Sequence, residues 1–236
     1  MQQCAFCRSF LVVASTFGLL YALLVPPFQS PDETAHFYRT AHLASGHLMA
    51  TQTPDKRLGG HLPKSLPELY LPFAELRYNY AARTSLVAFQ TAWQLPLRPE
   101  ETDFVDFPNV GYYAPFPYLF QATVLRAFLA FECRPMLLFY AGRLATLAVW
   151  LALALAALRL MPFASGSLAW LALLPSSLFL HASLTGDAVT NGLCFWLLAA
   201  MLSLAFGEKN FADSSRWLKA GIFVSSAMIV LSKPVY

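Results

Sequence analysis

Long apolar runs constrain this chain more than any other feature of its sequence. They lie at about 9–26, 112–131, 135–159, 167–185, 188–207 and 217–236. A helix of about 20 apolar residues is long enough to cross the hydrocarbon core of a bilayer. Only 12% of the residues are charged, whereas soluble domains carry about 25%. The sequence therefore predicts an integral membrane protein, built as an all-α bundle of transmembrane helices.

The run at 112–131 decides whether the chain crosses the membrane five times or six. It contains two prolines and Arg126, and an arginine at mid-bilayer costs roughly 2.5–3.5 kcal/mol. If this run returns to its own side, the basic residues between the other runs gather on the cytoplasmic side, as the positive-inside rule expects: Arg8, Arg159, Lys209, Arg216 and Lys219. We therefore expect five spans and a cytoplasmic N-terminus, with a sixth span at 112–131 as the alternative.

These runs divide the chain into three parts. Residues 1–26 form a first transmembrane helix, and residues 27–134 form a large extracytoplasmic loop that holds most of the charges. We expect two juxtamembrane helices in this loop, at about 30–46 and 112–131. Residues 135–236 form the remaining helices. Because the last apolar run reaches the end of the sequence, we expect this chain to be the N-terminal part of a longer membrane protein.

The stretch SPDETAHFYR begins just after the first span and predicts the first juxtamembrane helix. Ser30 can cap it, Pro31 suits its first turn, and Glu33 completes a capping box. Gly46 is a plausible stop. Apolar residues recur on one face at helical spacing, whereas the opposite face carries polar ones: Phe37, Ala41, Ala44 and Leu48 against Asp32, His36 and Arg39. This pattern predicts an amphipathic helix lying flat on the membrane surface.

The two carboxylates at the start of this helix have two interpretations. Acidic residues in a first turn complement the helix dipole, which is a structural task. However, Glu33 alone suffices for the capping box, so Asp32 has no structural task of its own. Both lie where a lipid-linked phosphate would present its head group. We therefore take Asp32 and Glu33 as candidate catalytic residues, and His36 and Arg39 as candidate substrate-binding residues.

Three further polar residues stand in apolar surroundings. Arg143 lies about a third of the way into a span and can hold a phosphate, snorkel to the surface or form a structural pair. Asp187, between two runs, can be a second site carboxylate or the cap of the next helix. Lys233 can be a phosphate ligand or an interface anchor. All three are retained as candidate substrate-binding residues.

The sequence contains no signature of nucleotide binding, zinc-peptidase or serine-hydrolase chemistry. The net charge of +3 is small and its basic residues are scattered, so nothing favours nucleic acid as a partner. Cys4 and Cys7 form a lone CxxC pair, which is weak evidence for a metal because zinc takes four ligands. A divalent cation stays open as a cofactor for the lipid phosphate.

Several segments, taken in order, carry a family resemblance: PPFQSPDETAHFYRTAHLASG, NVGYYAPFPYLFQA, YAGRLATL, LPSSLFLHASLTGDAVTNGL and LSKPVY. Together they resemble the bacterial membrane-protein family called domain of unknown function 2142. That family in turn looks like a branch of the GT-C superfamily of polytopic glycosyltransferases. The likeness covers most of the chain except about 51–105.

The resemblance implies an activity and a location. GT-C enzymes in the bacterial cytoplasmic membrane transfer a sugar from a polyprenyl-phosphate carrier to an extracytoplasmic acceptor, with inversion, in cell-envelope glycan assembly. Asp32 matches the loop carboxylate that acts as base or orients the acceptor, and Asp187 matches the second acidic position more loosely. The partners implied are the polyprenyl-linked sugar and membrane lipids. The alternatives are a non-catalytic component of lipid-linked-glycan transport or export, and a membrane scaffold.

Overall fold

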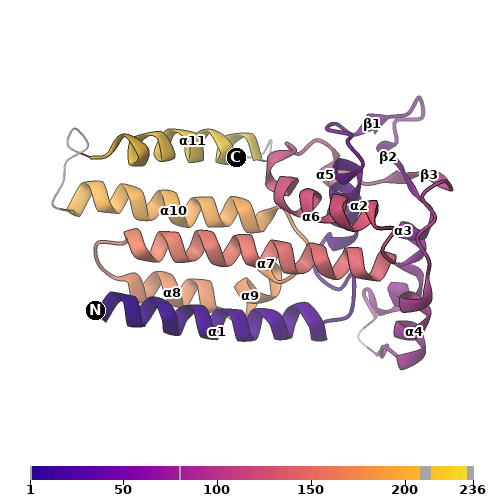
Figure 1. The fold of residues 1–236 in the computed structure, drawn as a ribbon, viewed down its shortest axis with the longest axis horizontal. Helices are drawn as coiled ribbons and strands as arrows, with labels where there is room; N and C mark the ends of the chain where they lie inside the picture. Colours follow the sequence, from indigo (N-terminus) through magenta and orange to yellow (C-terminus); the bar gives the residue numbers. More distant parts are fainter. Residues whose placement is uncertain (1, 80, 208–213, 233–236) are drawn as a thin grey trace.

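The computed structural model describes residues 2–79, 81–207 and 214–232. It is mostly helical and has two parts (Figure 1). Long helices run side by side in a bundle, and a mixed part of short helices and strands sits at one end of it. Buried apolar residues form one cluster inside the bundle and another inside the mixed part. The second cluster includes the first turns of α7 (Pro135–Leu160), which therefore anchors the mixed part to the bundle.

The bundle consists of α1, α7, α8, α9, α10 and α11. Besides α7, their bounds are Gln2–Leu24, Ser165–Leu173, Pro175–His181, Asp187–Phe206 and Arg216–Ser232. Within the described residues, three stretches are long and apolar enough to cross a membrane: Ala5–Leu24, Pro135–Leu160 and Asp187–Phe206. The total of five or six spans stays a prediction.

The run at 167–185 is not the single helix that its apolarity predicted. It breaks between α8 and α9, because Leu174 is extended, with ψ of 136°, and Pro175 begins the next helix. The ring of a proline disfavours helical backbone at the residue before it. The chain then turns through 182–186 into α10, so this turn lies at the same end of the bundle as the mixed part (Figure 1).

The mixed part contains a small antiparallel sheet, in the order β1-β2-β3, that the sequence did not predict. Its strands are Thr51–Gln52, Leu58–Pro63 and Thr102–Asp106. Gly59 of the central strand lies opposite Asp106, and Pro63 lies opposite Thr102. The prediction of an all-α fold is therefore right for most of the chain and wrong here. The short helices around the sheet are α2 (Glu33–Ala44), α3 (Ser65–Glu68), η1 (Leu71–Leu76), α4 (Leu86–Gln94), α5 (Pro108–Gly111), η2 (Phe116–Tyr118) and α6 (Leu119–Ala130).

Helix α2 lies inside the mixed part rather than flat on a membrane. Its apolar face is buried as expected, with Phe37 and Ala41 at 0% exposure. Its polar face is buried too, since Arg39 is also 0% exposed. Helix α6 and strand β2 both pack against it. The amphipathic pattern therefore separates two kinds of protein contact, not lipid from water.

The segment 112–131 folds as the short turn η2 followed by α6. Twelve residues of helix extend about 18 Å, well below the roughly 30 Å thickness of the hydrocarbon core. Helix α6 packs on α2 and on α7, and its Arg126 is exposed. This length favours the prediction that the segment returns to its own side.

Candidate functional site

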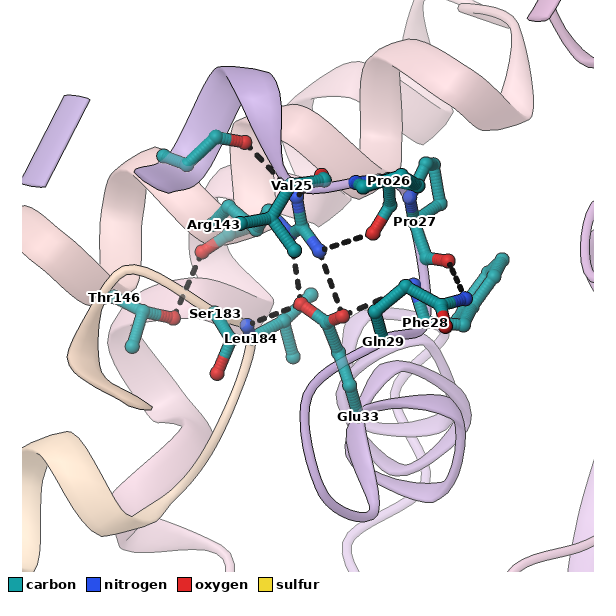
Figure 2. A network of polar contacts seen from close by, with 12 residues as sticks. Val25, Pro26, Pro27, Phe28, Gln29, Glu33, Arg143, Thr146, Ser183 and Leu184 are labelled. Carbon is teal, nitrogen blue, oxygen red and sulfur yellow. Dashed lines mark hydrogen bonds and ion pairs between the residues drawn. The ribbon is translucent and has the colours of Figure 1, made fainter. Parts of the chain in front are cut away.

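A buried ion pair joins α2 to α7 where the two parts of the molecule meet (Figure 2). Arg143 Nε donates to Glu33 Oε1 at 2.7 Å, and Arg143 Nη2 donates to Glu33 Oε2 at 2.8 Å. Neither side chain is more than 1% exposed. Paired hydrogen bonds between ionised groups are among the stronger polar contacts in proteins. The pair therefore fixes the start of α2 against the N-terminal third of α7.

The remaining donors of Arg143 bind the end of α1. Nη1 donates to the carbonyls of Ala22 and Val25 at 2.9 and 2.7 Å, and Nη2 donates to Pro26 at 3.1 Å. The last carbonyls of a helix have no partner within it, and a cation there is favoured by the helix dipole. All five guanidinium N–H groups are thus engaged. Of the three interpretations of Arg143, the structural pair is the one its contacts match, and no donor is left for a phosphate.

The carboxylate of Glu33 likewise has all of its hydrogen bonds made by protein groups. The backbone N–H of Leu184 donates to Oε1 at 2.9 Å, and that of Phe28 donates to Oε2 at 3.0 Å. With the two bonds from Arg143, each carboxylate oxygen accepts two hydrogen bonds. Figure 2 shows this carboxylate between Arg143, the 183–184 turn and the chain that leaves α1. The geometry gives Glu33 a positioning role, which differs from the catalytic role that its place in the sequence suggested.

The predicted capping box at the start of α2 is wrong. The helix begins at Glu33, whose side chain turns toward Arg143 instead of capping. Asp32 occupies the N-cap position in the left-handed region, with φ of 54°, and its side chain makes no capping bond. The hydroxyl of Ser30 is buried without a hydrogen-bond partner in the described chain. The ion pair therefore outweighs the local cap.

Asp32 lines an open hollow of about 690 Å³ at the base of the mixed part. One wall is the chain that leaves α1, with Pro26 and Phe28 to Asp32, and the other is formed by Leu76 to Asn79 and Ala82 to Thr84. The side chain of Asn109, in α5, donates to Asp32 Oδ1 at 3.1 Å. The left-handed backbone, tolerated by aspartate better than by most residues, together with this bond, holds an exposed carboxylate at the rim.

Two arginines share the hollow with Asp32. Arg77 and Arg83 both line it, and Arg77 also lines a smaller hollow of about 220 Å³ on the other side of Asp32. Helix α4 follows directly along the chain and exposes apolar side chains, with Leu86 at 82% and Val87 at 68%. A carboxylate, two guanidinium groups and an exposed apolar helix therefore occur together just beyond the end of α1.

His36 links α2 to the 182–186 turn. Its Nδ1 lies 2.8 Å from the hydroxyl of Tyr118, and its Nε2 lies 3.4 Å from Thr185 Oγ1. Thr185 Oγ1 also accepts a hydrogen bond from the backbone N–H of Asp187 at 3.1 Å. Because the Nδ1 and Nε2 atoms both have protein neighbours, His36 is part of the frame that holds the first turn of α10 near α2.

Asp187 lies at the start of α10, on the same end of the molecule as Asp32. Burial raises the pKa of the Tyr118 hydroxyl well above its usual range, and the negative charge of Asp187 adds to this effect. Asp32 raises the same pKa to a smaller degree. Both carboxylates therefore lie close enough to Tyr118 to raise its pKa, although of the two only Asp32 lines the large hollow.

Arg39 and His42 lie further along α2, three and six residues after His36. Arg39 Nη2 donates to the carbonyl of Leu48 at 2.7 Å and to that of Tyr113 at 3.3 Å, while its Nε and Nη1 are buried without a partner in the described chain. Burial lowers the pKa of Arg39. Burial also lowers the pKa of His42 to about 4, and the neighbouring basic groups, His47, Arg39 and His61, act in the same direction. Arg39 does not line the hollow of Asp32.

Two further predictions concern a metal and Lys233. Within residues 2–79, 81–207 and 214–232, no three histidine, cysteine, aspartate or glutamate side chains gather as metal ligands would. The carboxylates of Glu33 and Asp32 are directed to different partners. Lys233 lies outside the described residues, so its predicted phosphate contact stays a prediction.

Sequence reasoning missed Arg77, Arg83 and Asn109. Both arginines belong to the segment without a recognisable pattern, and only the fold brings them to Asp32. Asn109 lies in the segment FPNVG, just before the run at 112–131. An asparagine at the start of a short helix was the one available signal, and it is a weak one because capping explains it equally well.

A sequence comparison places the chain in a family. The model of the DUF2142 family, described as predicted membrane protein, matches residues 16–236. The chain belongs to this family. Neither a curated protein nor a solved structure matches it. Family membership thus agrees with the apolar helices of the bundle, and the activity has to be argued from the site.

Proposed function

We propose that this protein is a glycosyltransferase of the bacterial cytoplasmic membrane, which transfers a sugar from a polyprenyl-phosphate donor to an extracytoplasmic acceptor. The observation that carries the proposal is the position of Asp32. It is an exposed carboxylate with a left-handed backbone, held by Asn109, on a hollow that also contains Arg77 and Arg83. Strained residues of this kind concentrate at functional sites.

The proposed reaction needs two charges of opposite sign close together. The acceptor hydroxyl attacks the anomeric carbon, the bond from that carbon to the phosphate oxygen breaks, and Asp32 takes the proton of the hydroxyl. Positioned acid–base groups of this kind contribute roughly 10²–10⁴ in rate. The departing polyprenyl phosphate gains charge, which Arg77 and Arg83 stabilise. Asp187 does not line this hollow, so its proposed contact with the acceptor requires an acceptor that extends toward the start of α10.

This assignment moves the phosphate-binding role away from Arg143. The donors of Arg143 are all used by Glu33 and by the end of α1. Arg77 and Arg83 instead lie beside α4, whose exposed apolar residues fit the membrane surface where a polyprenyl chain emerges. The Glu33–Arg143 pair serves the site by fixing the stretch from Pro26 to Asp32 that forms one wall of the hollow.

The test is a transfer assay with the Asp32→Asn variant. The full chain is reconstituted in proteoliposomes with a panel of polyprenyl-phosphate hexoses, and the release of polyprenyl phosphate is measured. We expect the variant to lose at least 100-fold in rate. Its folding should stay intact, because the Asp32 side chain is exposed and makes no capping hydrogen bond. Asp55→Asn is the matched control, since Asp55 is an exposed aspartate in the same part of the chain. Full activity of Asp32→Asn would remove the proposed base.

The same assay separates the enzyme from its rival. A non-catalytic carrier of lipid-linked glycans would bind polyprenyl-phosphate hexose in the same hollow, since the arginines favour the phosphate in either case. It would release no free polyprenyl phosphate from any donor. Binding without release for the whole panel would therefore favour the carrier.

A further inference from the structure

A notch of about 310 Å³ opens on the side of the bundle where α9 and α10 pass α7. Its polar lining comes from all three helices: Trp150, Ser176, Ser177, His181, Asn191 and Cys194. Ser176 and Cys194 are exposed at its mouth, whereas Trp150 and His181 are buried behind them. Polar groups within a membrane-spanning bundle are costly and usually serve a function.

The wall of the notch is held rigidly. The His181 ring stacks on Trp150 with a centroid distance of 3.7 Å and an interplanar angle of 13°. Its two nitrogens face Ser177 Oγ at 3.2 Å and Asn191 Nδ2 at 3.1 Å. The histidine is therefore fully occupied by protein groups, and its role is to hold the indole in place.

The indole N–H of Trp150 has no hydrogen-bond acceptor among the described residues. Trp150 is 0% exposed, and its Nε1 has no partner within the described part of the chain. A buried donor without an acceptor is unfavourable. A ligand that brings an acceptor into the notch would supply what the protein does not.

The depth of the notch indicates which acceptor is available. On α10, Asn191 and Cys194 lie four and seven residues after Asp187, or about 6 and 10 Å along the helix. On α7, Trp150 lies seven residues after Arg143, again about 10 Å. Asp187 and Arg143 both lie at the junction with the mixed part, so the notch lies just beneath it. In a bilayer, the ester groups of the lipids occupy this layer, between the head groups and the acyl chains.

We propose that the notch binds the acyl-ester carbonyl of a glycerophospholipid. The carbonyl accepts one hydrogen bond, from the indole N–H, and the acyl chain continues along the apolar surface of α10. A polyprenyl chain is a pure hydrocarbon and has no acceptor at this depth. The site is thus distinct from the hollow of Asp32, and its ligand is a structural lipid of the surrounding membrane.

Ester- and ether-linked lipids with the same head group test this proposal. The full chain is reconstituted with an equal mixture of diacyl and dialkyl phosphatidylethanolamine, and the lipids retained are counted by native mass spectrometry. We expect about fivefold preference for the ester lipid, which corresponds to one net hydrogen bond. Trp150→Phe keeps the stacking ring but removes the N–H, so it should bring the preference close to one.

Two more variants keep the result decisive. Trp170→Phe is the matched control, because Trp170 is an exposed indole on α8 and should keep the preference. If Trp150→Phe does not fold, Cys194→Phe closes the mouth from an exposed position and should abolish the preference instead. Equal retention of both lipids by the unmodified chain overturns the proposal. So does a preference that persists in the Trp150 or Cys194 variant.

Discussion

Replacing Glu33 by glutamine tests whether the ion pair holds the two parts of the molecule together. Glutamine keeps the size of the side chain but replaces one accepting oxygen by an NH₂ group. That group would face either the donors of Arg143 or the N–H of Phe28 or Leu184, all of which now point at the carboxylate. The guanidinium would also stay buried without its counter-charge. Breaking a fully buried pair in this way costs about 3–5 kcal/mol.

The free energy of unfolding, measured by denaturant titration in mixed micelles, gives the result. We expect Glu33→Gln to lower it by about 3–5 kcal/mol. Arg143→Met should cost at least as much, because the carbonyls at the end of α1 lose their donors as well. The double variant should cost less than the sum of the two, since each single change removes the same contact.

The chain offers a matched control in Arg98 and Glu68. These two form an ion pair on the surface, where both side chains are about one third exposed. Exposed pairs contribute only about 0–1 kcal/mol, so Glu68→Gln should be nearly neutral. If the free energy of unfolding of Glu33→Gln stayed within 1 kcal/mol of that of the unmodified chain, the ion pair would not hold the two parts of the molecule together.

Three further predictions follow from the mixed part. Arg77→Gln should weaken the binding of polyprenyl monophosphate to the reconstituted chain at least tenfold, whereas Arg57→Gln, outside the hollow, should not; equal binding by both would contradict the phosphate role. Because the pKa of His42 falls from 6.5 to about 4 in the folded state, stability should be full above pH 6.5. It should fall by about 3 kcal/mol as the pH drops to 4, and this loss should vanish in His42→Phe. Gly60→Ala should lower the melting temperature, because the added Cβ would lie 2.3 Å from the His42 ring; an unchanged value would mean that the ring can move aside.

The sequence predicted the parts of the structure that depend on local pattern. Four of the six apolar runs became long helices, the exceptions being 112–131 and 167–185, and Gly46 follows the end of α2 with φ of 97°. The grouping of Asp32, Glu33 and His36 in one stretch also drew attention to the region where the two parts meet.

Long-range contacts explain what the sequence could not predict. Glu33 meets Arg143 across 110 residues and Leu184 across 151, and no local rule shows that this contact outweighs a capping box. The central strand of the sheet begins with Leu58 followed by two glycines and shows no alternation of polar and apolar residues. Arg77 reaches Asp32 only because the whole segment between them folds back. The position of the polar face of α2, inside the protein, likewise depended on α6 and β2.

The contacts of Glu33 also set an order of events during biosynthesis. Its carboxylate leaves the ribosome 110 residues before Arg143 and 151 before Leu184. Because the chain grows from one end, Glu33 has no ion-pair partner until α7 has been made, and it lacks the N–H of Leu184 until the turn after α9 has been made. The docking of the mixed part on α7 is therefore completed late in assembly, and a fault in the insertion of a late helix would leave this early-made part undocked.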